Sequence, residues 1–190
     1  SAYFQALGIP SSNIVFSDVT SEAMWREGSR RGSIDQCFPS KVALAHVHQL
    51  LTGMRKKPNI IFFPIFTTLL TELENVLDSC ACPTVAGTPQ VVKAAFTKEG
   101  DSFAQAGARY YDPVLSFAEP ELFEHQLLAF AGPALDVTES ENEHAIRQGY
   151  RALDRFRSSL RDQGRAVLEE LEREHRPGIA HRDPVAEKRP

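Results

Sequence analysis

The sequence has few of the features that place a chain in a familiar class at once. Its 190 residues include only 3 cysteines, too few and too odd in number for a disulfide framework. It has 21 basic against 25 acidic residues, a net charge of −4. We therefore expect no broad binding surface for nucleic acid or for an anionic membrane. The longest apolar run, residues 60–66, contains Pro64 and is far shorter than the roughly 20 residues that span a bilayer.

Several common catalytic motifs are also missing. The chain has no G-x-x-x-x-G-K-[ST] phosphate loop, no G-x-G-x-x-G turn and no G-x-S-x-G nucleophile elbow. Residues 1–10 lack the basic start and apolar stretch of a secretory signal, so we expect a cytoplasmic protein. A 42% apolar content over this length is enough for one buried core. We expect residues 1–175 to form one domain, cut from a larger protein, and the polar residues 176–190 to form a disordered tail.

Apolar spacing along the chain predicts helices and strands in alternation. The predicted strands are Asn13–Phe16, Asn59–Phe63 and Pro113–Phe117. The predicted helices are residues 3–7, 20–28, 40–51, 119–131 and a long amphipathic one at 141–174, with another that starts at Thr88 (N-cap) and Pro89. Residues 67–77 fit neither pattern. This order predicts an α/β fold, a Rossmann-like parallel sheet flanked by helices, with a long C-terminal amphipathic helix.

The first candidate for chemistry is Cys37, which precedes the predicted helix at 40–51. A thiol before a helix N-terminus lies where free N–H groups and the helix dipole favour negative charge. This position lowers a thiol pKa and suits a metal ligand or a nucleophile. From this segment alone, however, the favoured interpretation is that Cys37 is a small buried apolar residue.

The second candidate is the segment Cys80-Ala81-Cys82-Pro83. In an extended chain, residues two apart point to the same side, so both thiols could reach one metal. C-x-C is weaker evidence than C-x-x-C, because tight tetrahedral loops prefer the longer spacing. The alternative is a strand with one buried and one incidental cysteine.

Both cysteine segments are predicted near the carboxyl ends of strands, where parallel sheets bind ligands. Three thiols suit an iron–sulfur cluster with one open ligand position. Zinc with His46 or His48 as fourth ligand is a second possibility, although histidines two apart on a helix point in different directions. A thiol enzyme based on Cys37 and Lys41 is a third.

Four motifs arrive in a familiar order. They are Val15-Phe16-Ser17-Asp18, the run C-F-P-S-K-V-A-L-A-H-V at 37–47, N-I-I-F-F-P at 59–64, and A-C-P-T-V-A-G-T-P at 81–89. Together they resemble the domain attached to the CoA-substrate-specific enzyme activases of anaerobic bacteria, which activate 2-hydroxyacyl-CoA dehydratases. That domain is itself similar to the dehydratase subunits. The resemblance covers residues 3–174.

The resemblance implies a Rossmann-like domain whose cysteines hold a [4Fe–4S] or related cluster. Cys37 and Cys82 match the motif cysteines, whereas Cys80 matches no motif position and is a third candidate ligand. The implied role of this cluster is low-potential electron transfer for the dehydration of 2-hydroxyacyl-CoA. Exposure to air during purification can remove the cluster. Implied partners are an activase ATPase domain or dehydratase subunits, with acyl-CoA or a second copy as further possibilities. We expect no ATP hydrolysis by this chain. The alternative is a dehydratase-like interaction module without a cluster.

Overall fold

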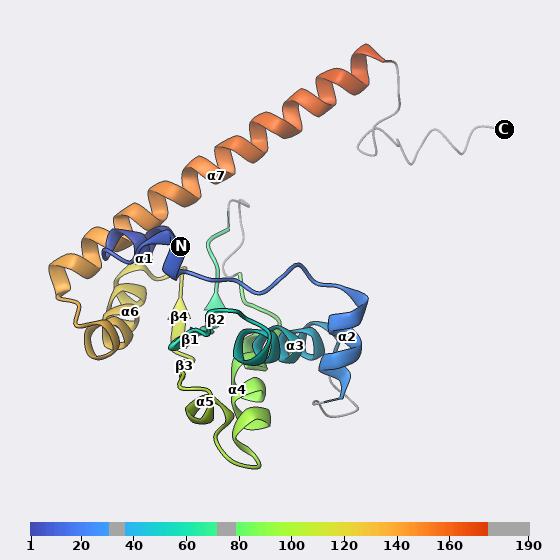
Figure 1. The fold of residues 1–190 in the computed structure, drawn as a ribbon. Helices are drawn as coiled ribbons and strands as arrows, with labels where there is room; N and C mark the ends of the chain where they lie inside the picture. Colours follow the sequence, from blue (N-terminus) through green and yellow to red (C-terminus); the bar gives the residue numbers. More distant parts are fainter. Residues whose placement is uncertain (31–36, 72–78, 175–190) are drawn as a thin grey trace.

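The computed structural model describes residues 1–30, 37–71 and 79–174 (Figure 1). The elements in chain order are α1 (Ala2–Ala6), the 3-10 turn η1 (Ser11–Asn13), α2 (Glu22–Ser29), α3 (Phe38–Thr52), β1 (Ile60–Phe62), β2 (Ile65–Thr68), α4 (Pro83–Thr97), α5 (Ser102–Gln105), β3 (Arg109–Tyr111), β4 (Val114–Ser116), α6 (Pro120–Leu135) and α7 (Glu139–Arg173). The predicted tail and most of the ambiguous segment at 67–77 lie outside the described residues. The prediction of mixed helices and strands with a long final helix is confirmed.

The strands form two short parallel pairs, β1 with β3 and β2 with β4. Ile60 of β1 lies opposite Arg109 of β3, and Ile65 of β2 lies opposite Val114 of β4, so both pairs have the same register. The same register places Pro64 opposite Pro113, between the two pairs. The Ile65 N–H donates to the Pro113 carbonyl at 2.9 Å, but Pro113 has no N–H to donate in return. The pairs are therefore one parallel ribbon interrupted by prolines. The described residues do not form the full Rossmann-like sheet that we expected.

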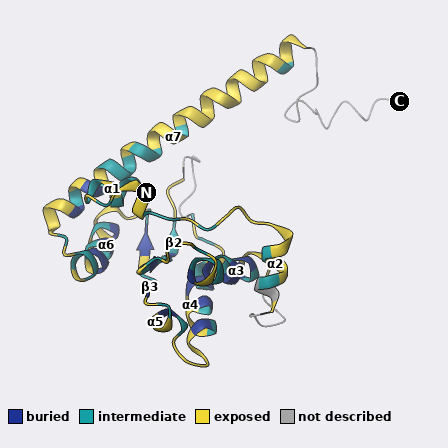
Figure 2. Cartoon of the chain, viewed as in Figure 1, coloured by how far each residue is buried: buried dark blue, intermediate teal, exposed yellow. Residues whose placement is uncertain are grey.

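Each face of this ribbon carries its own hydrophobic core. Successive side chains of a strand point to opposite faces, so Ile61 packs on one side and Phe62 on the other. The first core joins β1 to α3, α4 and α5; its buried residues are Leu44, Val47, Leu51, Ile61, Val92, Phe96, Phe103 and Ala108. The second joins β4 to α6; its buried residues are Leu115, Phe123, Leu127, Phe130 and Ala131. Helices thus cover both faces of the strands (Figures 1 and 2).

Helices α3 and α4 pack side by side and run in the same direction. Near their N-termini, the buried hydroxyl of Ser40 lies 2.8 Å from that of Thr88. Near their C-termini, Leu51 and Phe96 belong to the same core. Both helix N-termini therefore lie at one end of the pair, which matters because each follows a cysteine.

The beginning of the long helix α7 is anchored to the body of the molecule. Thr138 and Glu141 form a reciprocal capping box at its N-terminus. The fully buried Asn142 accepts a hydrogen bond from the Tyr3 hydroxyl at 2.7 Å and donates to the Glu124 carbonyl at 3.2 Å, which ties α7 to α1 and α6. From Ser158 onward the helix extends away from the body (Figure 2). Within the described ranges, no helix is both long and apolar enough to cross a bilayer.

One predicted strand was wrong. Asn13 ends the turn η1, and the residues up to Phe16 have no strand partner in the described part of the chain. Residues with a preference for strands form one when a neighbouring strand packs against them, and the described residues offer this segment no such neighbour. The Asn13 side chain instead accepts a hydrogen bond from Lys56 at 2.8 Å, which holds the segment against the loop after α3.

The start of α4 was also placed wrongly. The helix begins at Pro83 with Cys82 as N-cap, and Pro89 lies inside it. Cys82-Pro83 and Thr88-Pro89 carry the same start signal, a capping residue before proline, and the earlier one is used. Thr88 donates its hydroxyl to the Thr84 carbonyl at 2.7 Å, one turn back in the same helix.

Candidate functional site

Cys37 and Cys82 occupy equivalent positions on two neighbouring helices. Cys37 is the N-cap of α3 and Cys82 the N-cap of α4, and a proline follows in the first turn of each. Both thiols are free and exposed. The prediction that each cysteine precedes a helix is confirmed. The expected strand end is present for Cys82 only, because no described strand leads into Cys37.

Cys80 lies in extended backbone at the end of β2. It forms an antiparallel bridge with Thr68, flanked by hydrogen bonds from Leu69 N–H to the Ser79 carbonyl (2.9 Å) and from Ala81 N–H to the Thr67 carbonyl (3.0 Å). This is the conformation expected for the C-x-C segment. It brings a third exposed thiol to the edge of the sheet from which α4 starts.

The packing of α3 on α4 places Cys37 and Cys82 at the same edge of the molecule. Ser40 and Thr88, which connect the helices, are 1% and 5% exposed. Thr88 lies about one turn deeper in its helix than Ser40 does, so the N-terminus of α4 projects roughly 5 Å beyond that of α3. The axes of packed helices lie about 8–10 Å apart. The two cysteines therefore belong to one local surface, which the sequence alone did not establish.

A chain of hydroxyl groups connects Cys37 to the junction of the two helices. Thr88 donates its one hydroxyl hydrogen to the Thr84 carbonyl, so Ser40 must be the donor in the 2.8 Å contact with Thr88. Cys37 Sγ lies 3.7 Å from Ser40 Oγ. Since the Ser40 hydrogen is already directed to Thr88, the protonated Cys37 thiol donates to Ser40.

The environment of Cys82 favours its thiolate. The Val85 N–H is the largest cause of a lowered Cys82 pKa, and the Thr84 N–H and hydroxyl act in the same direction. These are the free donors of the first turn of α4, to which the helix dipole adds. The thiol is open to solvent, so it combines access with the negative charge that metals and electrophiles require.

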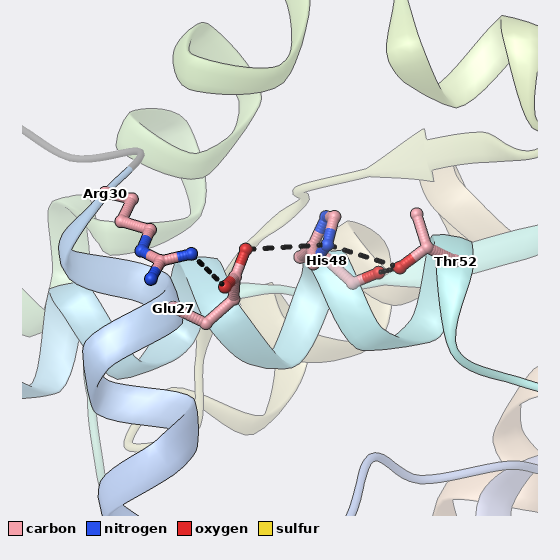
Figure 3. Close-up of polar contacts among 4 residues, drawn as sticks. All are labelled: Glu27, Arg30, His48 and Thr52. Atoms are coloured by element: carbon pink, nitrogen blue, oxygen red, sulfur yellow. Dashed lines mark hydrogen bonds and ion pairs between the residues drawn. The ribbon is translucent and has the colours of Figure 1, made fainter.

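The two histidines of α3 serve a different face. His46 Nε2 lies 3.1 Å from the Thr20 hydroxyl, and burial lowers the His46 pKa. His48 Nε2 lies 3.8 Å from Glu27 of α2 and 3.3 Å from the Thr52 hydroxyl (Figure 3). Both rings thus contact the N-terminal part of the chain. Within residues 1–30, 37–71 and 79–174, no three His, Cys, Asp or Glu side chains gather as ligands for one metal ion.

The described residues do not present the ligand set of a single metal ion. One zinc ion needs all its ligands within about 2.0–2.3 Å of one point. An iron–sulfur cluster distributes its cysteines over several irons, so the thiols can stand further apart. Exposed apolar residues adjoin all three cysteines in sequence or in the sheet: Phe38, Leu69, Leu70 and Val85. Beside Cys80, the buried Thr68 hydroxyl has no hydrogen-bond partner in the described structure.

A separate apolar cavity of about 370 Å³ lies on the other core, between the ends of the strands and helices α6 and α7. Its lining includes Phe66, Phe117, Phe123, Tyr150, Leu153 and Phe156. The buried Tyr150 hydroxyl has no partner among the described residues, and burial raises its pKa. The aromatic spacing of α7 was the only signal of this cavity in the sequence.

Comparison with known families gives one match. The family described as "CoA enzyme activase uncharacterised domain (DUF2229)" matches residues 1–181. No curated protein and no solved structure matches the chain. The matched region includes all three cysteines and both helices that follow them.

Proposed function

The chain belongs to the CoA enzyme activase uncharacterised domain family, and from that premise we propose that it is an iron–sulfur domain for electron transfer to acyl-CoA dehydratases. The observation that carries the proposal is the pair of exposed cysteines, Cys37 and Cys82, at the N-caps of two adjacent parallel helices. Two helix N-termini at one edge favour an anionic group there. Reduced iron–sulfur clusters with thiolate ligands are such groups.

Cys37 and Cys82 are the proposed anchors, and Cys80 is the proposed third ligand. A [4Fe–4S] cluster bound by three thiolates keeps one iron open to water, substrate or another group. The cluster would supply one-electron chemistry at low potential. First-turn N–H groups of this chain stabilise the thiolate at Cys82.

The proposed partners are an activase ATPase domain and the dehydratase subunits. The chain has no phosphate-binding loop, so ATP-driven reduction would come from the partner. In this scheme the domain receives or relays the electron that starts removal of water from a 2-hydroxyacyl-CoA.

The test is anaerobic reconstitution of the chain with iron and sulfide. We expect bound iron and sulfide in equal amounts, a brown colour, and an electron paramagnetic resonance signal after reduction. Cys37→Ser or Cys82→Ser should abolish all three. Thr97→Val, which keeps every thiol and lies at the far end of α4, is the matched control and should still bind the cluster. A colourless, iron-free wild-type chain that is folded by circular dichroism would refute the proposal.

A second candidate is an interaction module without a cluster. The apolar cavity and the exposed half of α7 favour it, because both offer surface to another protein. On this reading, the Cys37→Ser/Cys82→Ser chain binds purified dehydratase as tightly as the wild type does. A loss of binding together with the iron would exclude this candidate.

A further inference from the structure

The second half of α7 is a helix whose side chains are exposed in the part of the chain that the structure describes. Residues 158–170 are all exposed, a length of roughly 20 Å. An isolated helix this short is marginal in water, so packing on one face is what stabilises such segments. An apolar stripe at helical spacing runs along this segment and extends beyond both of its ends. The stripe consists of Leu153, Phe156, Leu160, Val167 and Leu171. Phe156, Leu160 and Val167 are 60%, 51% and 54% exposed.

Gly164 interrupts this stripe between Leu160 and Val167. Glycine inside an exposed helix destabilises it relative to alanine. A Cβ at this position would meet no heavy atom of the described residues within 4 Å, so their packing does not require glycine here. A second helix that crosses here would require it, because the missing side chain lets two backbones approach closely.

The charges of α7 are divided along its length. Residues 147–165 contain six arginines and two aspartates, whereas residues 169–174 contain four glutamates and one arginine. A parallel pair of these helices would place like charges together. An antiparallel pair that crosses at Gly164 would place the acidic end of each helix beside the basic part of the other, as charged flanks do in paired helices.

We propose that α7 pairs with α7 of a second copy of this chain, antiparallel, about a two-fold axis at Gly164. In this register Phe156 of each helix lies near Leu171 of the other, and Arg157, which flanks the stripe, lies near Glu172. The interface is the same patch on both copies, so the assembly closes as a dimer. The stripe continues into the apolar cavity through Leu153 and Phe156, so the second helix also covers the mouth of that cavity.

Light scattering of the chain after size exclusion tests the pairing. We expect a dimer at micromolar concentration for the wild type and a monomer for Leu160→Glu. Ser158→Glu, on the opposite face of the same turn, is the control and should remain a dimer. A monomeric wild type would overturn the proposal. Protection of α7 from proteolysis only after dehydratase is added would also overturn it, because the helix would then pair with dehydratase and not with a second copy.

Two further variants test the orientation and the crossing point. Arg157→Glu should weaken the dimer by repulsion from Glu172, and adding Glu172→Arg should restore it, which a parallel pair would not do. Gly164→Leu should weaken the dimer although leucine favours the helix more than glycine does. A tighter dimer with Gly164→Leu, or no rescue in the charge-reversed pair, would overturn the antiparallel crossing at Gly164.

Discussion

The hydrogen bond between Ser40 and Thr88 aligns the two helices that carry Cys37 and Cys82, and its removal should cost a predictable free energy. Ser40→Ala deletes the donor and leaves a buried acceptor lone pair on Thr88, while the Thr88 bond to the Thr84 carbonyl survives. A net hydrogen bond contributes about 0.5–1.5 kcal/mol, and an unsatisfied buried group costs about 1–3 kcal/mol. We expect Ser40→Ala to lower the free energy of unfolding by about 1–2 kcal/mol.

Thr88→Val keeps the side-chain shape and removes the hydroxyl. It leaves both the Ser40 hydrogen and the Thr84 carbonyl without their partner, so we expect a loss of about 2–3 kcal/mol. In the double variant the Ser40 hydroxyl is gone as well, and one of those two penalties disappears. The double variant should therefore be more stable than the sum of the single losses by about 1 kcal/mol.

Urea unfolding, followed by circular dichroism and by fluorescence of the single tryptophan, Trp25, measures these differences. With an unchanged slope, a loss of 1–2 kcal/mol moves the midpoint by roughly 0.5–1 M. Thr97→Val is the matched control, because the Thr97 hydroxyl also bonds a carbonyl one turn back, that of Lys93, but is exposed. Additive losses in the Ser40/Thr88 cycle would refute the inference that this contact connects α3 to α4.

Two more predictions follow from single side chains. The first concerns Cys82 in a Cys37→Ser/Cys80→Ser chain, where the rate of alkylation by iodoacetamide is measured against pH. The midpoint of this profile should lie below the ordinary thiol pKa, because a lowered pKa keeps the thiolate populated to lower pH. Val85→Pro removes the N–H that is the largest cause of the lowered pKa and should raise the midpoint, and an unmoved midpoint would contradict that cause. Asn142→Ala should lower the free energy of unfolding by about 2–3 kcal/mol, since it strands the Tyr3 hydroxyl and empties a fully buried site. Urea unfolding checks this loss, and a change below about 0.5 kcal/mol would mean that Asn142 does not hold α7 to α1.

The local features of the site could be predicted from the sequence. A proline in the first turn of an apolar helical pattern is a start signal that acts over a few residues, and it predicted the helix that follows Cys37. The long helix was also predictable, because its 3.6-residue spacing persists from Ile146 to Leu171. Its capping residue, Thr138, lies slightly before the predicted start.

The assembly of the site could not be predicted in the same way. Ser40 and Thr88 are 48 residues apart, and no local pattern marks either as the partner of the other. Thr88 was read as a helix start because Thr-Pro carries the same local signal as Cys82-Pro83. Strand β3 was missed since Arg109–Tyr111 is short and becomes a strand only by pairing with β1.

The hydroxyl chain behind Cys37 connects the surface of the molecule to the packing of two helices. A chemical change at the exposed Cys37 sulfur that alters its contact with Ser40 also alters the contact of Ser40 with Thr88. The junction of α3 and α4 is buried, and it nevertheless responds to the chemistry of an exposed thiol.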